Sequence, residues 1–130
     1  MVHSIGGIDM REIKFRVWDS EKKKILPIQR HSFKTGKSMP YGWNIEYVFD
    51  GLMQYTGLKD KNGKEVYEGD VLLYNNDIKS IVHYKNGAFV RSYENSNIYL
   101  LYDSFITDGC LDDYEVIGNI YEDKHLLEEV

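Results

Sequence analysis

The sequence has one cysteine, two prolines and no long apolar run, and each shortage excludes a kind of protein. Cys110 alone cannot form an intrachain disulfide, so the fold is not held by disulfides and a reducing compartment is favoured. No segment approaches the ~20 apolar residues that span a bilayer. Residues 1–10 lack the basic region and the apolar stretch of a secretion signal. We therefore expect a cytoplasmic protein without a membrane segment.

Residues typical of metal and catalytic sites are also sparse. A zinc site needs about four Cys or His ligands at close spacing, whereas the histidines are scattered at His3, His31, His83 and His125. The aspartates in residues 103–113 do not have EF-hand spacing, and an acidic loop is usually just solvated. A nucleophilic pair of Cys110 with a distant histidine has no local support. We therefore expect no metal, no cofactor, no catalytic residue and a protein that is not an enzyme.

Positive charge is in short supply as well. The 16 Lys and Arg residues are outnumbered by 21 Asp and Glu residues, which gives a formal net charge of −5. Nucleic-acid binding depends on clustered Lys and Arg that neutralise phosphates. The only basic runs are Lys22-Lys23-Lys24, which a solvated turn explains more simply, and the sparse set Arg30, Lys34 and Lys37. Nucleic acid is therefore an unfavoured partner.

Tyrosine, by contrast, is abundant, with 11 residues. Its ring favours strands and half-buried surfaces, so this count indicates β structure. Apolar and polar residues alternate from Arg11, with Ile13, Phe15 and Val17 on one face, which predicts a half-buried strand. Similar patterns predict strands at residues 24–30, 43–49, 78–84, 88–93, 98–102 and 114–121, and two more within residues 52–74.

Short turn signals separate these strands. Asn and Gly accept positive φ, so Asn62-Gly63 predicts the tip of a two-residue hairpin, and Asn86-Gly87 predicts a second corner between strands. Gly69-Asp70 predicts a third corner, where the Asp70 carboxylate accepts backbone N–H groups. Two irregular segments, residues 31–42 and 103–113, are expected to be long loops. Asp123 is positioned to cap a short helix over residues 124–129.

These elements predict one mainly β domain over residues 10–130, preceded by a flexible tail of residues 1–9. Short, strongly turned antiparallel strands close most easily into a small barrel, because closure removes the exposed edges. A Gly-Asp pair that enters an apolar strand, as Gly69-Asp70 does, is similar to a corner of SH3-like barrels. We therefore expect a small antiparallel barrel with long loops and a C-terminal helix, with a two-sheet sandwich as the alternative.

Three blocks of the chain, residues 10–19, 52–71 and 114–122, resemble the YopX family of phage and prophage proteins in sequence and in order. The central block contains Gln54-Tyr55-Thr56-Gly57-Leu58-Lys59-Asp60 and Glu68-Gly69-Asp70-Val71. The resemblance implies a β-rich fold and an origin in a phage or prophage. It implies no activity and offers no catalytic residue to carry over.

We therefore expect a non-enzymatic phage or prophage accessory protein that acts as a binding or assembly module. A nucleic-acid-binding small β-barrel is the alternative, and a small hydrolase would require converging titratable groups in a deep pocket. Large side chains on both faces of the strands predict a homo-oligomer, or contact with a host or phage protein. The candidate binding surface consists of Trp18, Trp43, Tyr74, Tyr93, Tyr99 and Tyr102, and the candidate structural turns are Asn62, Gly63, Gly69, Asp70, Asn86 and Gly87.

Overall fold

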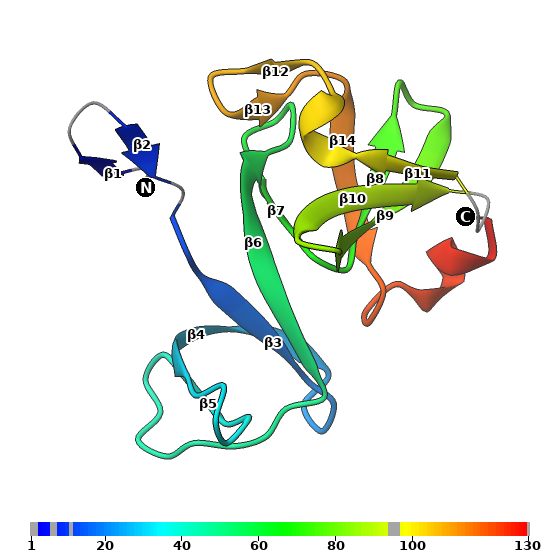
Figure 1. Ribbon diagram of the computed structural model, residues 1–130. Coiled ribbons are helices and arrows are strands. Elements are labelled where there is room, and N and C mark those ends of the chain that lie inside the picture. Colours follow the sequence, from blue (N-terminus) through cyan, green and yellow to red (C-terminus); the bar gives the residue numbers. More distant parts are fainter. Residues whose placement is uncertain (1–2, 6–7, 11, 94–96, 130) are drawn as a thin grey trace. The chain divides into compact units, whose positions relative to one another are not determined.

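The computed structural model describes residues 3–5, 8–10, 12–93 and 97–129. The fold is mainly β, as the sequence predicts, and its helical elements are two short 3₁₀ helices within the described residues (Figure 1). Contacts divide the chain into two compact units, residues 1–55 and residues 56–130, which we call unit 1 and unit 2. Strand β6 (Gly51–Lys59) contributes its first residues to unit 1 and the rest to unit 2.

Unit 1 contains a hairpin and an antiparallel sheet. The hairpin consists of β1 (His3–Ile5) and β2 (Ile8–Met10), paired with each other. It occupies most of the segment that the sequence predicts to be a flexible tail, residues 1–9. In the sheet, β3 (Phe15–Asp19) lies between the start of β6 and β4 (Lys24–His31), and β5 (Ser38–Pro40) pairs with β4. Val17, Ile28, Met53 and Tyr55 form its buried apolar residues.

Two sequence predictions in unit 1 need correction. Residues 43–49 do not form a strand, because Tyr47 makes only one isolated bridge, to Ser38, and the aromatic side chains there pack on one another instead. Residues 31–42 are not wholly a loop, because they contain β5. Apolar alternation alone does not distinguish a paired strand from an extended segment whose rings find partners locally.

Unit 2 is built on a five-stranded antiparallel sheet. Its order is β11 (Asn97–Leu100), β10 (Ala88–Tyr93), β9 (Ile78–Lys85), β8 (Asp70–Tyr74) and β14 (Tyr114–Asn119). A smaller group of strands pairs with the end of β6: β7 (Glu65–Tyr67), and β13 (Cys110–Leu111), which also pairs with β12 (Ile106–Thr107). Residues 103–113, expected to be a loop, therefore contain a short hairpin.

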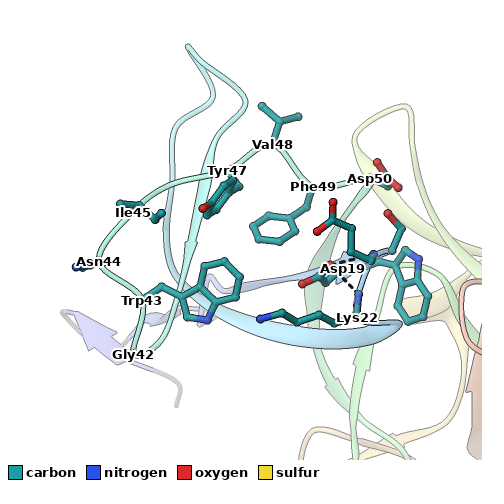
Figure 2. Close-up of a pocket in the computed structure, with 13 residues that line it drawn as sticks. Asp19, Lys22, Gly42, Trp43, Asn44, Ile45, Tyr47, Val48, Phe49 and Asp50 are labelled. Carbon is teal, nitrogen blue, oxygen red and sulfur yellow. Dashed lines mark hydrogen bonds between the residues drawn. The ribbon is translucent and has the colours of Figure 1, made fainter.

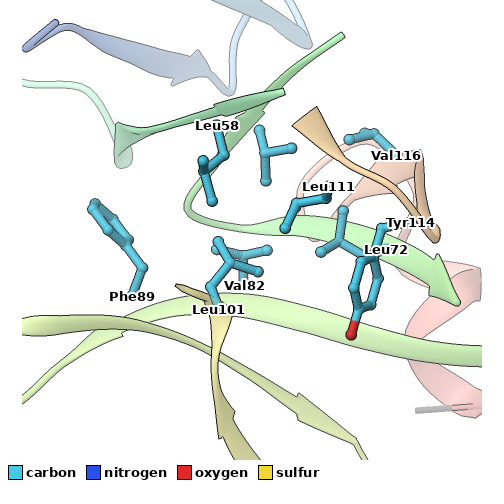
Figure 3. Close-up of a cluster of buried hydrophobic side chains, with 9 residues drawn as sticks. Leu58, Leu72, Val82, Phe89, Leu101, Leu111, Tyr114 and Val116 are labelled. Carbon is cyan, nitrogen blue, oxygen red and sulfur yellow. The ribbon is translucent and has the colours of Figure 1, made fainter. Parts of the chain in front are cut away.

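The core of unit 2 lies between these strands (Figure 3). Leu72 and Val82 from the large sheet meet Leu58 and Leu111 from the smaller strands, and Leu101 joins them from the 3₁₀ helix η1 (Leu101–Asp103). Val66, Leu72, Leu101 and Leu111 are fully buried. Because β6, β13 and η1 supply apolar cover, the large sheet need not close on itself.

The expected SH3-like barrel is not confirmed. Among the described strands β11 and β14 stand at opposite ends of the large sheet and do not pair, so the sheet stays open. The expected C-terminal α-helix is not confirmed either: residues Lys124–Glu129 form the 3₁₀ helix η2. The Asp123 carboxylate accepts the Asn119 N–H at 3.1 Å, which directs it towards the preceding turn and not towards a helical N-terminus.

The predicted turns differ in how well they match. The corner at Asn86-Gly87 is confirmed: the two residues have φ of 52° and 82° and form a two-residue hairpin between β9 and β10. At the other tip only Gly63 has positive φ, at 83°, so the two-residue turn predicted there is wrong. The Gly63 N–H donates to the Asp60 carbonyl and the Asp60 N–H to the Lys64 carbonyl, which makes a three-residue loop with glycine last. At the third corner Gly69 has φ of 84°, and the Asp70 carboxylate accepts the Tyr67 N–H at 2.8 Å, as expected.

Replacing Gly63 by valine should lower the free energy of unfolding by about 1–2 kcal/mol, because a β-branched residue resists positive φ. No atom lies within 4 Å of a Cβ built at Gly63, so the loss measures backbone strain and not a clash. Asn62→Val is the matched control, since Asn62 is equally exposed and lacks positive φ. Urea unfolding of both variants tests the assignment, and equal midpoints would contradict it.

Candidate functional site

A hollow of about 570 Å³ lies in unit 1 (Figure 2). Two segments line it: the turn between β3 and β4, from Trp18 to Lys22, and residues 42–50. The volume falls within the range of small-ligand and side-chain pockets in proteins. The chain contains two tryptophans, and both line this hollow.

Three aromatic rings form one wall of the hollow. The ring centroids of Trp43 and Tyr47 are 5.6 Å apart, those of Trp43 and Phe49 are 5.9 Å apart, and those of Tyr47 and Phe49 are 6.3 Å apart. The ring planes are steeply inclined, at 63–88°, which is the edge-to-face arrangement that aromatic pairs favour. Figure 2 shows the rings of Trp43, Tyr47 and Phe49 beside one another, and all three residues line the hollow. The alternating aromatic residues that predicted a strand therefore place three rings beside one another on one wall of the hollow.

Backbone hydrogen bonds hold residues 42–50 in place. The N–H groups of Ser38 and Tyr47 donate to each other's carbonyls at 2.7 and 3.0 Å, and the Trp43 N–H donates to the Pro40 carbonyl at 3.2 Å. A charged contact adds to them, because Nε of Arg30 donates to the Glu46 carboxylate at 2.9 Å. The aromatic wall is thereby attached to the sheet through β4 and β5.

The opposite side of the hollow is the β3–β4 turn, which the Asp19 carboxylate shapes. Asp19 is buried, and its Oδ1 accepts the N–H groups of Glu21 and Lys22 at 3.1 and 3.2 Å (Figure 2). This turn directs the Lys22 side chain across the hollow, where Nζ lies 5.0 Å from the centroid of the Trp43 ring. That distance is within the range of a cation–π interaction.

The charges that line the hollow are mostly negative. Asp19, Glu21 and Asp50 supply carboxylates, and Lys22 supplies the single cation among the lining residues. The Asp19 carboxylate is engaged by backbone N–H groups, whereas Glu21, Lys22 and Asp50 are exposed to solvent. The hollow therefore offers aromatic faces and two solvent-facing carboxylates to a ligand.

A second aromatic cluster surrounds Arg91 in unit 2. The guanidinium carbon lies 4.8 Å from the centroid of the Tyr99 ring and 5.2–6.0 Å from three other tyrosine rings, those of Tyr74, Tyr93 and Tyr114. Tyr93 and Tyr99 stack on each other at 5.7 Å. The Arg91 Nε is buried and has no hydrogen-bond partner among the described residues. A hollow of about 180 Å³, lined also by Asp103 and Asp113, lies beside the guanidinium.

The six residues expected to form one binding surface do not lie at one site in the structure. Trp18 and Trp43 share the hollow of unit 1, and Tyr74, Tyr93 and Tyr99 share the Arg91 cluster of unit 2. The Tyr102 hydroxyl donates to the Thr56 carbonyl and so has a structural partner. Sequence reasoning missed Tyr47, Phe49 and Lys22 as partners of Trp43. The repeated aromatic residues from Trp43 to Phe49 are visible in the sequence, but they were interpreted as a strand and not as the wall of a binding site.

The remaining titratable groups are dispersed. Partial burial and then the charge of Lys85 lower the pKa of His83 below its ordinary value, and its Nε2 lies 2.9 Å from the Ser92 hydroxyl oxygen in unit 2. No three His, Cys, Asp or Glu side chains converge to hold a metal ion in the part of the chain that the structure describes. None of the described helices is long and apolar enough to cross a membrane.

Comparison with known proteins places the chain in a family and shows a solved structure of similar fold. A family model described as YopX protein matches residues 14–128, so the chain belongs to the YopX family. Among solved structures it is similar to protein EF1440 from Enterococcus faecalis, with 26% sequence identity and a TM-score of 0.65. That match covers 90% of this chain and 99% of the other. No curated protein matches the sequence.

Proposed function

We propose that this member of the YopX family is a non-enzymatic binding module that takes a side chain of a protein partner into the hollow of unit 1. The observation that supports the proposal is the aromatic wall of Trp43, Tyr47 and Phe49, which faces a 570 Å³ space opposite the β3–β4 turn. Aromatic anchors seated in such a space dominate many protein interfaces. Family membership supports an origin in a phage or prophage and action in the host cytoplasm.

The partner is expected to make contact beyond the hollow. Val48 and Ile45 beside it are 68% and 52% exposed, and Tyr47 is 46% exposed. Apolar side chains gathered around a hollow mark an interaction site more often than scattered ones do. A host or phage protein that inserts one side chain and covers this rim fits the arrangement.

Replacing Trp43 by alanine should reduce capture of the partner at least tenfold, because the largest ring of the wall is lost. Tagged wild-type and variant protein are incubated with host lysate, with and without nuclease, and the retained proteins are compared. Phe33→Ala is the matched control, because Phe33 is an exposed aromatic residue of unit 1 outside the hollow. Equal capture by the wild type and Trp43→Ala would overturn the proposal, provided both variants keep the thermal midpoint of the wild type.

Self-association is proposed to involve unit 2. Strand β11 stands at the end of the large sheet, and Ile98, Tyr99 and Leu100 on it are each almost half exposed. An exposed apolar edge strand tends to pair with another copy of itself, and twofold dimers are the commonest soluble oligomers. Light scattering is expected to show a dimer that Leu100→Glu dissociates. A mass near one 15.3 kDa chain for the wild type would contradict this.

The alternative function is binding of single-stranded nucleic acid. The tyrosine rings around Arg91 supply stacking faces of the kind that bind bases, which supports it. The net charge of −5 opposes it, because few phosphates would be neutralised. Fluorescence anisotropy with random oligonucleotides at physiological salt is expected to show no binding. A salt-sensitive micromolar complex that Arg91→Ala weakens would favour the alternative.

A further inference from the structure

We propose that the hollow of unit 1 selects a cationic side chain, an arginine or a lysine of the partner, and that Lys22 occupies the place of this cation in the free protein. The inference rests on the proposed function and specifies its ligand. Three features of the hollow carry it: the inclination of the rings, the position of Lys22 and the sign of the surrounding charge.

The aromatic wall has the geometry that attracts a cation. The face of an aromatic ring carries partial negative charge, whereas its edge is partially positive. Three rings inclined at 63–88° with centroids 5.6–6.3 Å apart cannot all turn their edges to one neighbouring space. A group that enters beside them therefore meets ring faces as well as edges. Cages of this kind hold ammonium and guanidinium groups.

Lys22 shows where such a cation lies. Its Nζ is 5.0 Å from the centroid of the Trp43 ring, inside the roughly 6 Å limit for cation–π attraction. The Lys22 ammonium has no hydrogen bond or ion pair with any other described side chain, and the residue is exposed. An exposed lysine loses little when its flexible stem swings into water. A partner's cation can therefore replace it over Trp43.

The carboxylates of the hollow favour the same sign of ligand. Glu21 and Asp50 are exposed among its lining residues, and Asp19 adds a buried negative charge behind the turn. When Lys22 swings away, Glu21 and Asp50 remain among the lining residues, and no cation is left among them. An anionic ligand held by Lys22 would lie in a hollow lined by these carboxylates, and like charges repel. A neutral apolar ligand would gain no electrostatic attraction from the carboxylates.

Tryptophan fluorescence measures this selectivity without a label, because both tryptophans line the hollow. The whole chain is titrated at constant ionic strength with N-acetyl-arginine amide, with its neutral isostere N-acetyl-citrulline amide and with N-acetyl-glutamate amide. We expect a saturable change with the arginine compound, at least tenfold weaker binding of the citrulline compound and none of the glutamate compound. Equal binding of the arginine and citrulline compounds, or stronger binding of the glutamate compound, would overturn the inference.

The Lys22→Met variant tests the replacement step, because methionine keeps an unbranched apolar stem and removes the competing charge. We expect it to bind the arginine compound several-fold more tightly than the wild type does. Lys34→Met, at an exposed lysine outside the hollow, is expected to bind it as the wild type does. Weaker binding by Lys22→Met would show that Lys22 is part of the receptor and would contradict the replacement.

The outcomes also separate this inference from the proposed function. If Trp43→Ala loses the protein partner but the arginine and citrulline compounds bind alike, the hollow is a binding site without selectivity for charge, and only the inference fails. If Trp43→Ala keeps the partner, the proposed function fails. The titration with the three compounds still measures whether the hollow binds a cation more tightly than a neutral or an anionic group.

Discussion

Replacing Asp60 by alanine should lower the free energy of unfolding by about 3–5 kcal/mol, because three backbone N–H groups lose a charged acceptor together. The Asp60 side chain is 1% exposed. Its Oδ1 accepts the N–H groups of Asn62 and Lys64, and its Oδ2 accepts the N–H of Val116, all at 2.9 Å. One carboxylate thus shapes the loop after β6 and joins that loop to β14.

The size of this loss follows from burial. Removal of the carboxylate leaves the buried Val116 N–H desolvated without compensation, and it takes a charged acceptor from the partly buried N–H groups of Asn62 and Lys64. A second link between the same segments, the Lys61 N–H to the Tyr114 carbonyl at 2.9 Å, depends on the same loop shape. The variant therefore weakens the contact of the loop with β14 as well as the loop itself.

Two further variants make the Asp60 prediction specific. Asp60→Asn keeps the volume but presents an NH₂ group to one of the donors, so we expect it to lose most of the same stability. Asp77→Ala removes an exposed aspartate from another turn of unit 2, and we expect a change within about 0.5 kcal/mol. Urea unfolding measures all three. An Asp60→Ala midpoint equal to that of Asp77→Ala would show that the carboxylate is not the organising group.

Local chemistry made the turns and most of the strands predictable. Asn86-Gly87 has positive φ at both positions, because this dipeptide favours the turn that matches the twist of its strands. The two-residue turn predicted at Asn62-Gly63 is wrong for a reason that is also local. Asp60 accepts two N–H groups inside the loop and so favours a three-residue loop over the two-residue turn. A carboxylate three residues before the glycine was visible in the sequence, but its burial against β14 was not.

Long-range arrangement was less predictable. Alternation at residues 43–49 predicted a strand, and the structure instead gathers Trp43, Tyr47 and Phe49 into a wall. The barrel was inferred from the need to remove strand edges, yet the apolar face of the large sheet is covered by residues such as Leu58, Leu101 and Leu111 from other elements. Strand number and period do not reveal which segments return to cover a sheet.

The candidate site was foreseen only in part. Both tryptophans were assigned to the candidate binding surface, and the structure brings them to one hollow. Lys22 was interpreted as part of a solvated turn, and it is exposed in the structure. Its position over Trp43 depends on the hydrogen bonds that Asp19 makes within the turn and on the path of residues 42–50. Contacts between segments twenty residues apart leave no periodic trace in the sequence.

Thr56→Val is expected to lower the free energy of unfolding by about 2–4 kcal/mol, although valine has nearly the same shape as threonine. Thr56 is fully buried at the start of unit 2. Its hydroxyl donates to the Val66 carbonyl at 2.8 Å and accepts the Leu58 N–H at 3.1 Å. Gly57, which lies between Thr56 and Leu58, has φ of 86°, so strand β6 bends there. The Thr56 hydroxyl therefore replaces the carbonyl to which the Leu58 N–H would donate in a regular sheet.

Valine would leave that donor and that acceptor buried and unpaired, and each such group costs about 1–3 kcal/mol. Thr107→Val is the matched control, because Thr107 is exposed and its hydroxyl donates to the Asp112 carboxylate at 2.8 Å, where water can take over either role. We expect a change within about 0.5 kcal/mol for the control. Thermal and urea unfolding distinguish the two. A Thr56→Val protein as stable as the wild type would mean that the bend at Gly57 does not need the hydroxyl, and that packing of Leu58 and Val66 alone holds β6 against β7.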